Sequence, residues 1–412
     1  MPSTRYLTAL QAAQQLGVTV PTLYAYVSRG LIRSENTTNP ADKRARRYAA
    51  DDVQRLLERT RLQHHLDKMP DSTLHWGMPV LDSALTCVNE GHLYYRGRDV
   101  VALSGQSSFE EVAALFWAND PTASTRLFAS PMTKWPAGLG GLAKKWSTWL
   151  PIDRMMTALP VAARDEVAAS DIRSAAVARV GVRIVQLLTS TLIGRPSRGA
   201  HLPTAEQLQR AFAPQQPALI PLFDAALIVC ADHELNASSF TARCVASTSA
   251  NPYAVVSAGL AALQGPKHGG ACEGAFSFLS SIKNQTQARE AVVARLREGQ
   301  VIPGFGHTLY PQGDPRGRLL MDLLARTFPR SATVRTAQVV AATVAELLEE
   351  FPTVDFGIAA LVAALGLPAG TGLGLFALGR TVGWIGHAQE QYQSDRLIRP
   401  RAHYVGSAPG QH

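Results

Sequence analysis

Apolar and polar residues alternate along most of this chain at the three- and four-residue spacing of helices that bury one face. From about residue 77 to residue 405 the pattern predicts a mostly helical body, punctuated by prolines between about 120 and 215. Strand-like alternation is weak, and only residues 91–97 fit a short hairpin. The sequence has no repeated strand–helix–strand pattern, no P-loop and no strand-led G-x-G-x-x-G. We therefore predict an all-α fold.

One uncharged stretch, residues 356–379, is long enough to span a bilayer. It contains Pro368 and six glycines, and it is bounded directly by Asp355 and Arg380. Such breakers favour two short helices buried in protein, interrupted at residues 366–368. The rest of the chain offers no second span and no aromatic belt, so we expect no membrane contact.

The first residues have a pattern of their own. Residues 8–16 predict a short helix with Thr8 as N-cap, and Gly17 permits a tight turn. A second helix is predicted from about 20 to 29 and a third from 50 to 61. Apolar positions of the first two helices close a small core, which predicts a helix-turn-helix.

Charge strengthens this interpretation. Residues 1–63 hold ten Lys and Arg against five Asp and Glu, so +5 of the chain's net +8 lies here. A basic wing at residues 43–47 suits phosphate contacts. With the exit at residues 30–32 and the wing end at 47–48, the unit resembles a MerR-type winged helix-turn-helix. The candidate DNA-binding residues are Thr22, Tyr24, Tyr26, Arg29, Lys43, Arg44, Arg46 and Arg47. A docking or dimerisation unit without DNA binding is the alternative.

The overall composition allows a large core. Of 412 residues, 46% are hydrophobic and 17% are charged, which excludes wholesale disorder. The positive balance suits anionic partners, either nucleic acid or an acidic metabolite. Four cysteines lack C-x-x-C and zinc-ligand spacing, so we expect free thiols and no metal. The start lacks the apolar core of a secretory signal, and we expect a cytoplasmic protein.

Three residues in glycine-, proline- or apolar-flanked segments carry the candidate chemistry. They are His268 in QGPKHGG, His307 in PGFGHTLY and Asp355 in TVDFG. Two imidazoles and one carboxylate suffice to abstract a proton next to a carbonyl and to donate to the oxygen that becomes negative. The nearby arginines suit a carboxylate-rich substrate: Arg316, Arg380, Arg399 and Arg401. His92 and His387 match no catalytic position, and we interpret them as structural.

Several sequence motifs surround these residues and follow one another in a fixed order. They are LYYRGRDV (93–100), SFEEV (108–112), ADHELNASSFTAR (231–243), GPKHGG (265–270), the 303–316 segment ending in Asp-Pro-Arg, VDF (354–356), GRTVGW (379–384) and IRPR (398–401). In this order and at these spacings the chain resembles citrate synthase across roughly residues 77–406. The resemblance implies a condensation of acetyl-CoA with oxaloacetate that gives citrate and CoA, a reaction of the tricarboxylic acid cycle.

The resemblance also implies roles. Asp355 would remove a proton from the acetyl methyl, His268 would stabilise the enol, and His307 would bind and protonate the oxaloacetate ketone. The carboxylates of oxaloacetate would contact His233, Arg316, Arg380 and, from the partner subunit of a homodimer, Arg399. Gly304 and Gly306 would belong to the CoA site. No metal or cofactor is implied, because acetyl-CoA is a substrate.

The family's architecture implies domain boundaries. Residues 1–63 would be the winged helix-turn-helix and 64–76 a linker. A large helical domain would comprise 77–264 and 356–405, a small helical domain 265–355, and residues 406–412 a tail. Closure of the small domain would exclude water before chemistry.

The match is imperfect at the CoA site. The family usually places Lys or Arg after the tyrosine at position 310, where it helps hold CoA phosphates, and here Pro311-Gln312 stands instead. This leaves the acid–base groups intact but puts the substrate and the turnover in question. Two alternatives stay open: a 2-methylcitrate synthase that uses propionyl-CoA, and a transcriptional regulator whose citrate synthase-like body senses ligands without turnover.

Overall fold

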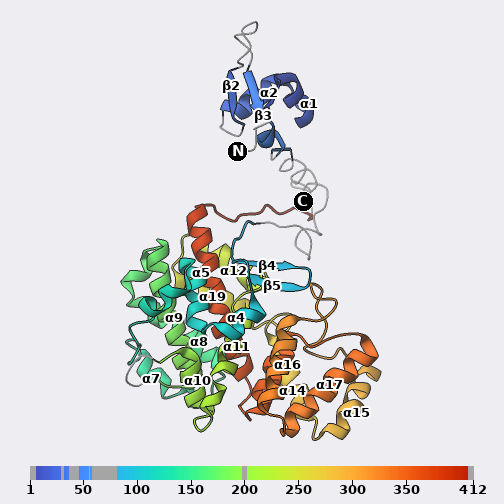
Figure 1. The fold of residues 1–412 in the computed structure, drawn as a ribbon. Helices are drawn as coiled ribbons and strands as arrows, with labels where there is room; N and C mark the ends of the chain where they lie inside the picture. The colour runs from blue at the N-terminus through green and yellow to red at the C-terminus, as the bar shows by residue number, and fades with distance from the viewer. Residues whose placement is uncertain are drawn as a thin grey trace. The chain divides into compact units, whose positions relative to one another are not determined.

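The computed structural model describes residues 6–28, 32–36, 46–54, 56–57, 81–196 and 202–406. The chain divides into two compact units, Met1–Asp82 with Arg401–His412, and Ser83–Pro400 (Figure 1). The expected linker at 64–76 lies outside the described residues, as does all of the expected tail beyond residue 406. The division of the body into 77–264 with 356–405, and 265–355, stays a prediction.

Among its described residues, the N-terminal unit contains β1 (Tyr6–Leu7), α1 (Ala9–Leu16), α2 (Val20–Ser28), β2 (Ser34–Asn36) and β3 (Arg46–Ala49). Residues 50–54 and 56–57 are helical, at the start of the predicted third helix, and residues 58–61 lie outside the described part. The strands pair antiparallel in the order β1-β3-β2. Thr8 caps α1 in a capping box with Gln11, and Gly17 ends the helix at φ +66°. That conformation favours glycine, which explains the tight turn. The predicted helix-turn-helix is confirmed.

A small core closes this unit. Leu16, Leu23, Ile32, Tyr48 and Val53 are all buried. The carboxylate of Asp52 accepts two bonds from the Arg33 guanidinium, at 2.8 and 3.0 Å. Apolar packing therefore closes the unit, and this pair ties the helical residues after β3 to the residue before β2.

The body, Ser83–Pro400, is predominantly helical, and the predicted all-α class is confirmed. Its α-helices are α4 (Val100–Gln106), α5 (Phe109–Ala118), α6 (Ser124–Leu127), α7 (Leu139–Ala143), α8 (Pro151–Arg164), α9 (Ser174–Ile193), α10 (Thr204–Phe212), α11 (Ile220–Cys230), α12 (Ala237–Ala246), α13 (Pro252–Leu263), α14 (Gly270–Ser281), α15 (Gln285–Arg297), α16 (Pro315–Thr327), α17 (Ala332–Leu348), α18 (Val354–Ala364) and α19 (Thr371–Ser394). Helices α14–α17, in yellow-orange to orange, gather at one end of the body (Figure 1).

A second small sheet, β4 (Thr86–Asn89), β5 (His92–Tyr95) and β6 (Arg98–Asp99), stands at the start of the body. The strands are antiparallel, with Thr86 opposite Tyr95. The hairpin predicted at residues 91–97 is displaced: these residues form the middle strand, with one turn on either side. Strands this short carry too few alternating positions for the sequence to fix their turns.

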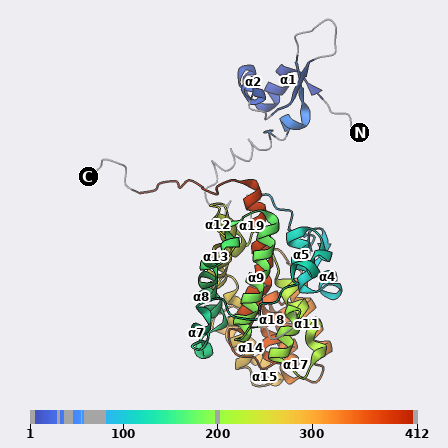
Figure 2. The same ribbon diagram turned by 90° about the vertical axis from the view of Figure 1, so that its left-hand side faces the viewer.

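The uncharged stretch forms α18 and the start of α19, and the break falls before α19 at the predicted glycines and proline. The expectation of two short helices is wrong for the second, since α19 runs 24 residues to Ser394. Buried along nearly its whole length, α19 packs against α9, α11, α12 and α13 (Figure 2). Close approach explains its small residues: a Cβ on Gly383 would lie 2.5 Å from the Ala231 carbonyl oxygen.

Within the described ranges, α9 is the one helix long and apolar enough to cross a membrane. However, 78% of its apolar window is buried inside the protein. A helix that is mostly buried and exposes only one side, here with Arg179 and Arg183, is a core helix of the protein.

Candidate active site

Loops and helix starts of the body carry the predicted catalytic residues. His268 lies in the turn between α13 and α14, His307 in the loop between α15 and α16, and Asp355 in the first turn of α18. The substrate candidates are placed similarly: His233 follows α11, Arg316 lies in the first turn of α16, and Arg380 lies within α19.

His233, His307 and Tyr310 form one aromatic cluster. The two imidazole centroids are 5.2 Å apart, and the Tyr310 hydroxyl lies 2.9 Å from Nε2 of His233. The Arg316 guanidinium covers the Tyr310 ring at 5.6 Å. Burial, and then the charge of Arg316, lower the pKa of His233 well below its ordinary value. The cluster is therefore a neutral surface beside a cation.

The protons of His307 can be placed. Its Nδ1 accepts the Leu309 backbone N–H at 3.1 Å. Burial, followed by the charge of Arg316, lowers the pKa of His307 to about 4, so the ring is neutral at pH 7. We therefore assign its single proton to Nε2, which makes that atom a hydrogen-bond donor.

A buried ion pair lies behind this loop. Asp314 accepts two bonds from the Arg316 guanidinium, at 2.9 and 2.8 Å, and both residues are almost fully buried. The same carboxylate caps α16 by accepting the Arg316 backbone N–H and also accepts the Val354 N–H at 3.1 Å. Asp314 thus joins the start of α16 to the start of α18, where Asp355 lies.

The Asp355 carboxylate is only partly satisfied. Its Oδ2 lies 3.3 Å from the Thr353 hydroxyl, whereas Oδ1 is buried without a hydrogen-bond partner among the described residues. Burial raises the pKa of Asp355 to about 6, against the opposing charge of Arg316. A desolvated carboxylate with a free oxygen is a stronger base than one in water.

Ser238 controls the protons of His268. Its hydroxyl oxygen lies 2.8 Å from Nε2 of His268 and accepts the Trp384 indole N–H at 3.2 Å. It also lies 2.8 Å from Oδ1 of Asn236, but that oxygen already accepts the backbone N–H groups of Ser238 and Ser239. We therefore assign the hydroxyl proton of Ser238 to Nε2 of His268.

This contact decides which ring nitrogen of His268 carries the proton. Burial, and then the charge of Arg380, lower the pKa of His268 to about 4, so the ring is neutral at pH 7. With Nε2 accepting a bond, its one proton lies on Nδ1.

Arg380 connects the parts of this site electrostatically. Its charge adds to the effect of burial in lowering the pKa of His268, and it opposes the larger effect of burial that raises the pKa of Asp355. Its Nε donates to the Cys230 carbonyl at 2.7 Å, while Nη1 is buried without a partner among the described residues. Burial lowers the pKa of Arg380 itself. An unsatisfied buried guanidinium nitrogen needs an acceptor, and a substrate carboxylate would provide one.

The glycines predicted for CoA shape the loop before His307. Gly304 and Gly306 have φ +84° and +71°, a conformation that favours glycine. The Gly304 carbonyl accepts the Thr353 N–H at 2.9 Å, and the Gly306 N–H donates to the Phe351 carbonyl at 3.1 Å. These backbone groups therefore hold the loop against the start of α18. Their contact with CoA stays a prediction.

Other predicted residues do not join this cluster. Arg399 and Arg401 are exposed, in the segment that follows α19. The N-terminal candidates lie in the other unit, where Tyr24 and Arg46 are exposed and the Arg47 guanidinium covers the Tyr6 ring at 5.0 Å. The predicted DNA contacts Arg29, Lys43 and Arg44 lie outside the described residues.

Sequence reasoning missed three residues of the site: Ser238, Asp314 and the hydroxyl of Tyr310. Each lies in a quoted motif, but no local spacing shows which neighbour from another helix a side chain contacts. Among the described residues, no group of three or more His, Cys, Asp or Glu side chains is arranged to hold a metal ion.

Comparison with known proteins identifies the body. The family model "Citrate synthase, C-terminal domain" matches residues 73–401. The chain belongs to the citrate synthase family. The model "MerR HTH family regulatory protein" matches residues 7–67, so a MerR-type helix-turn-helix precedes the citrate synthase body.

Relatives carry two different names. Citrate synthase 2 of Bacillus subtilis is 39% identical over 46% of this chain, and the alignment spans about half, 52%, of that relative. A 2-methylcitrate synthase of Mycobacterium tuberculosis is 30% identical over 76% of this chain and 84% of its own length. The crystal structure of citrate synthase from Thermotoga maritima matches with a TM-score of 0.70 and 28% identity, covering 82% of this chain and 96% of that one.

Proposed function

We propose that this protein condenses an acyl-CoA with oxaloacetate, as a citrate synthase-type acyltransferase. The observation that carries the proposal is the pairing of two neutral imidazoles, each with an assigned donor proton, with the Asp355 carboxylate, whose buried Oδ1 has no hydrogen-bond partner among the described residues. These are the groups that enolisation of a thioester and its addition to a ketone require.

In the first step, Asp355 takes a proton from the carbon next to the thioester carbonyl. His268 donates its Nδ1–H to the thioester oxygen and stabilises the enol. The α-proton of a thioester is far too weakly acidic for a carboxylate in water. Burial of Asp355 therefore supports the assignment, since it raises the pKa of the base to about 6.

In the second step, the enol carbon attacks the ketone carbon of oxaloacetate. His307 donates its Nε2–H to the ketone oxygen, which becomes a hydroxyl. Water then hydrolyses the new thioester, and CoA leaves as a free thiol. As the thioester carbonyl re-forms, the proton on its oxygen returns to Nδ1 of His268. The one proton that Asp355 takes from carbon is therefore balanced by the one that His307 delivers to the ketone oxygen.

Oxaloacetate carries two carboxylates, and the site offers cations for them. Nη1 of Arg380, which has no partner among the described residues, supports a carboxylate contact, and the charges of Arg316 and Arg380 both act on the neutral His233 ring. In a homodimer, which we also propose, Arg399 of the partner subunit would complete the set. Bidentate arginine–carboxylate pairs fix orientation as well as charge.

The next question is which acyl group the CoA thioester carries. The name citrate synthase implies acetyl-CoA and the name 2-methylcitrate synthase implies propionyl-CoA, and both names occur among the relatives. We propose acetyl-CoA as the preferred substrate. An equimolar mixture of both thioesters with oxaloacetate, analysed by mass spectrometry, tests this. An excess of citrate is expected, and an excess of 2-methylcitrate would reverse the assignment.

Ser238 provides a specific test of the proton assignment. Replacing Ser238 with alanine removes the donor that holds His268 in its Nδ1–H form, and we expect kcat to fall about 10- to 100-fold. The KM for oxaloacetate should stay nearly unchanged. Ser257→Ala is the matched control, because within the described part of the chain the Ser257 hydroxyl donates to the Tyr253 carbonyl of its own helix, α13. Equal kcat in both variants would refute the assignment.

The MerR match favours a second function, DNA binding by the N-terminal unit. Exposed Arg46 is a candidate phosphate contact. We expect Arg46→Ala to reduce the slope of log affinity against log salt by about 1. Fluorescence anisotropy of a labelled mixed-sequence duplex at several salt concentrations measures it, with exposed Arg335→Ala of α17 as control. Absence of duplex binding even at low salt would instead favour a docking unit.

A further inference from the structure

One short segment serves two parts of the proposed mechanism. Residues 232–239 carry His233, which faces the substrate cluster, and Ser238, which orients His268. The segment has no helix of its own before α12 begins at Ala237. Its geometry must therefore be held by contacts with other elements.

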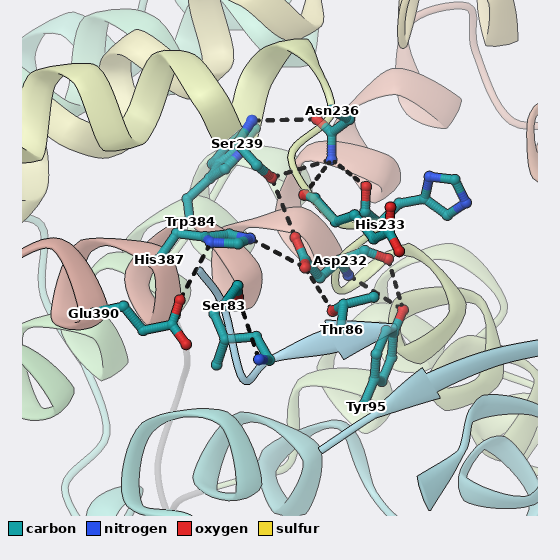
Figure 3. A network of polar contacts seen from close by, with 12 residues as sticks. Ser83, Thr86, Tyr95, Asp232, His233, Asn236, Ser239, Trp384, His387 and Glu390 are labelled. Carbon is teal, nitrogen blue, oxygen red and sulfur yellow. Dashed lines mark hydrogen bonds and ion pairs between the residues drawn. The ribbon is translucent and has the colours of Figure 1, made fainter. Parts of the chain in front are cut away.

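Asp232 provides the side-chain contacts. It is fully buried, and its carboxylate accepts the Thr86 hydroxyl at 2.6 Å, the Ser239 hydroxyl at 3.1 Å and Nε2–H of His387 at 3.2 Å (Figure 3). Burial acts to raise the pKa of Asp232, but the neighbouring His387 and Arg380 outweigh it and hold that pKa below its ordinary value. Asp232 is thus an ionised acceptor tied to β4, α12 and α19.

The backbone is fixed from two further sides. The Tyr95 hydroxyl lies 3.0 Å from the Asp232 carbonyl oxygen and 3.2 Å from its nitrogen. The Gly383 N–H donates to the Ala231 carbonyl at 3.0 Å. A Cβ on Gly383 would also meet the Asp232 carboxylate at 2.5 Å, so α19 approaches this segment at a glycine. Little freedom remains next to His233.

His387 is the link on α19. It is fully buried, and its Nδ1 lies 3.9 Å from the Glu390 carboxylate (Figure 3). Glu390 in turn accepts the Ala84 backbone N–H at 2.7 Å and pairs with Arg243 at 3.2 Å. The network therefore ends on a charge pair between Glu390 and the buried Arg243.

Stability alone gives little reason for such a network. A buried ionised aspartate costs desolvation, and apolar residues of similar volume are often as stable as a buried polar pair. A polar network whose members bond to one another does, however, specify one geometry. Nδ1 of His387 is the one atom of this network that lacks a hydrogen bond among the described residues, and it faces the Glu390 carboxylate at 3.9 Å. The geometry specified here is that of the segment holding His233 and Ser238.

We propose that Asp232 and His387 form a positioning pair that holds His233 in place for oxaloacetate. This rests on the proposed function, since it concerns the same substrate site. Neither residue touches the reacting atoms, and both act through the 233–239 segment. The pair assigns a role to His387 that extends the purely structural one expected from the sequence.

The test is equilibrium binding of oxaloacetate by isothermal titration calorimetry on the full chain, together with steady-state kinetics. His387→Leu removes the donor, and we expect the dissociation constant and the KM for oxaloacetate to rise about tenfold or more. His387→Gln keeps a nitrogen donor at the same reach from Cβ, and we expect binding within about threefold of the parent protein. The KM for acyl-CoA should stay nearly constant in both.

A second pair of variants covers the case in which His387→Leu does not fold. Thr86→Val removes one bond to Asp232 without a change of size, and we expect oxaloacetate binding to weaken about threefold or more. Thr189→Val is the matched control, because that buried hydroxyl, as far as the structure describes the chain, donates to the Val185 carbonyl of its own helix. We expect no change in oxaloacetate binding for this control.

The outcomes are separable. If the parent protein binds oxaloacetate and both Thr86→Val and folded His387→Leu bind it equally well, the positioning pair is overturned. The proposed function then stays intact. Failure of His387→Gln to restore binding to a folded protein also overturns it. A parent protein that does not bind oxaloacetate overturns the proposed function and the positioning pair together.

Discussion

Replacement of Asp355 by asparagine is expected to lower the rate of CoA release by about 10²- to 10⁴-fold, the range for loss of a general base. The substitution keeps the size of the side chain and removes its ability to accept a proton from carbon. Oxaloacetate should still bind, because the Asp355 oxygens are not among the groups proposed to hold it. The measurement is thiol appearance with acetyl-CoA and oxaloacetate.

The assignment of Asp355 as the base also predicts how the activity changes with pH. Burial raises the pKa of Asp355 to about 6, and the ionised form is the active base. kcat/KM should therefore rise as the pH increases through about 6 and then level off, and it should be lost as the pH falls below that value. The residual rate of the asparagine variant should lack this step.

A nearby carboxylate provides the control. Asp322 is exposed on α16, and Asp322→Asn should keep the parent rate and profile. If Asp355→Asn retains the parent's rate within about threefold while Asp322→Asn does the same, another group is the base, since loss of a base costs far more.

The second large effect concerns stability. Replacing Arg316 with methionine leaves Asp314 ionised and buried without its partner, and we expect a loss of about 3–5 kcal/mol in the free energy of unfolding. The carboxylate would keep only the backbone N–H groups of residues 316 and 354. Urea unfolding followed by circular dichroism measures the shift in midpoint.

Arg318→Met is the matched control for this experiment. Arg318 is exposed two residues further along α16, and among the described residues its side chain donates to the Gln312 carbonyl. A change within about 0.5 kcal/mol is expected for it, as for other surface substitutions. A similar small change for Arg316→Met would mean that the Asp314–Arg316 pair does not hold α16 against α18.

Local signals predicted local structure well. Thr8 caps α1 and Gly17 ends it, because both effects depend on neighbours in sequence. The break between α18 and α19 was predicted for the same reason. The length of α19 was not, since its glycines are explained by close packing with α9, α11 and Ala231 from elsewhere in the chain.

In the candidate site, too, features that depend on local sequence could be predicted and contacts between distant segments could not. His268, His307 and Asp355 could be named because their flanking motifs are distinctive. The proton assignments could not, since Ser238 and Trp384 reach His268 from other helices. The same limit applies to His387. Its partner Asp232 lies 155 positions away in sequence, and no sequence pattern indicates that the two are in contact.

The most direct test of the central claim is CoA release from acetyl-CoA by the full chain, followed with a thiol reagent in the presence and absence of oxaloacetate. Convergence of His268, His307 and Asp355 on one keto acid predicts release that requires oxaloacetate and yields one citrate per thiol. Release that is equally fast without oxaloacetate, or no release at all by folded protein that binds both substrates, would contradict it.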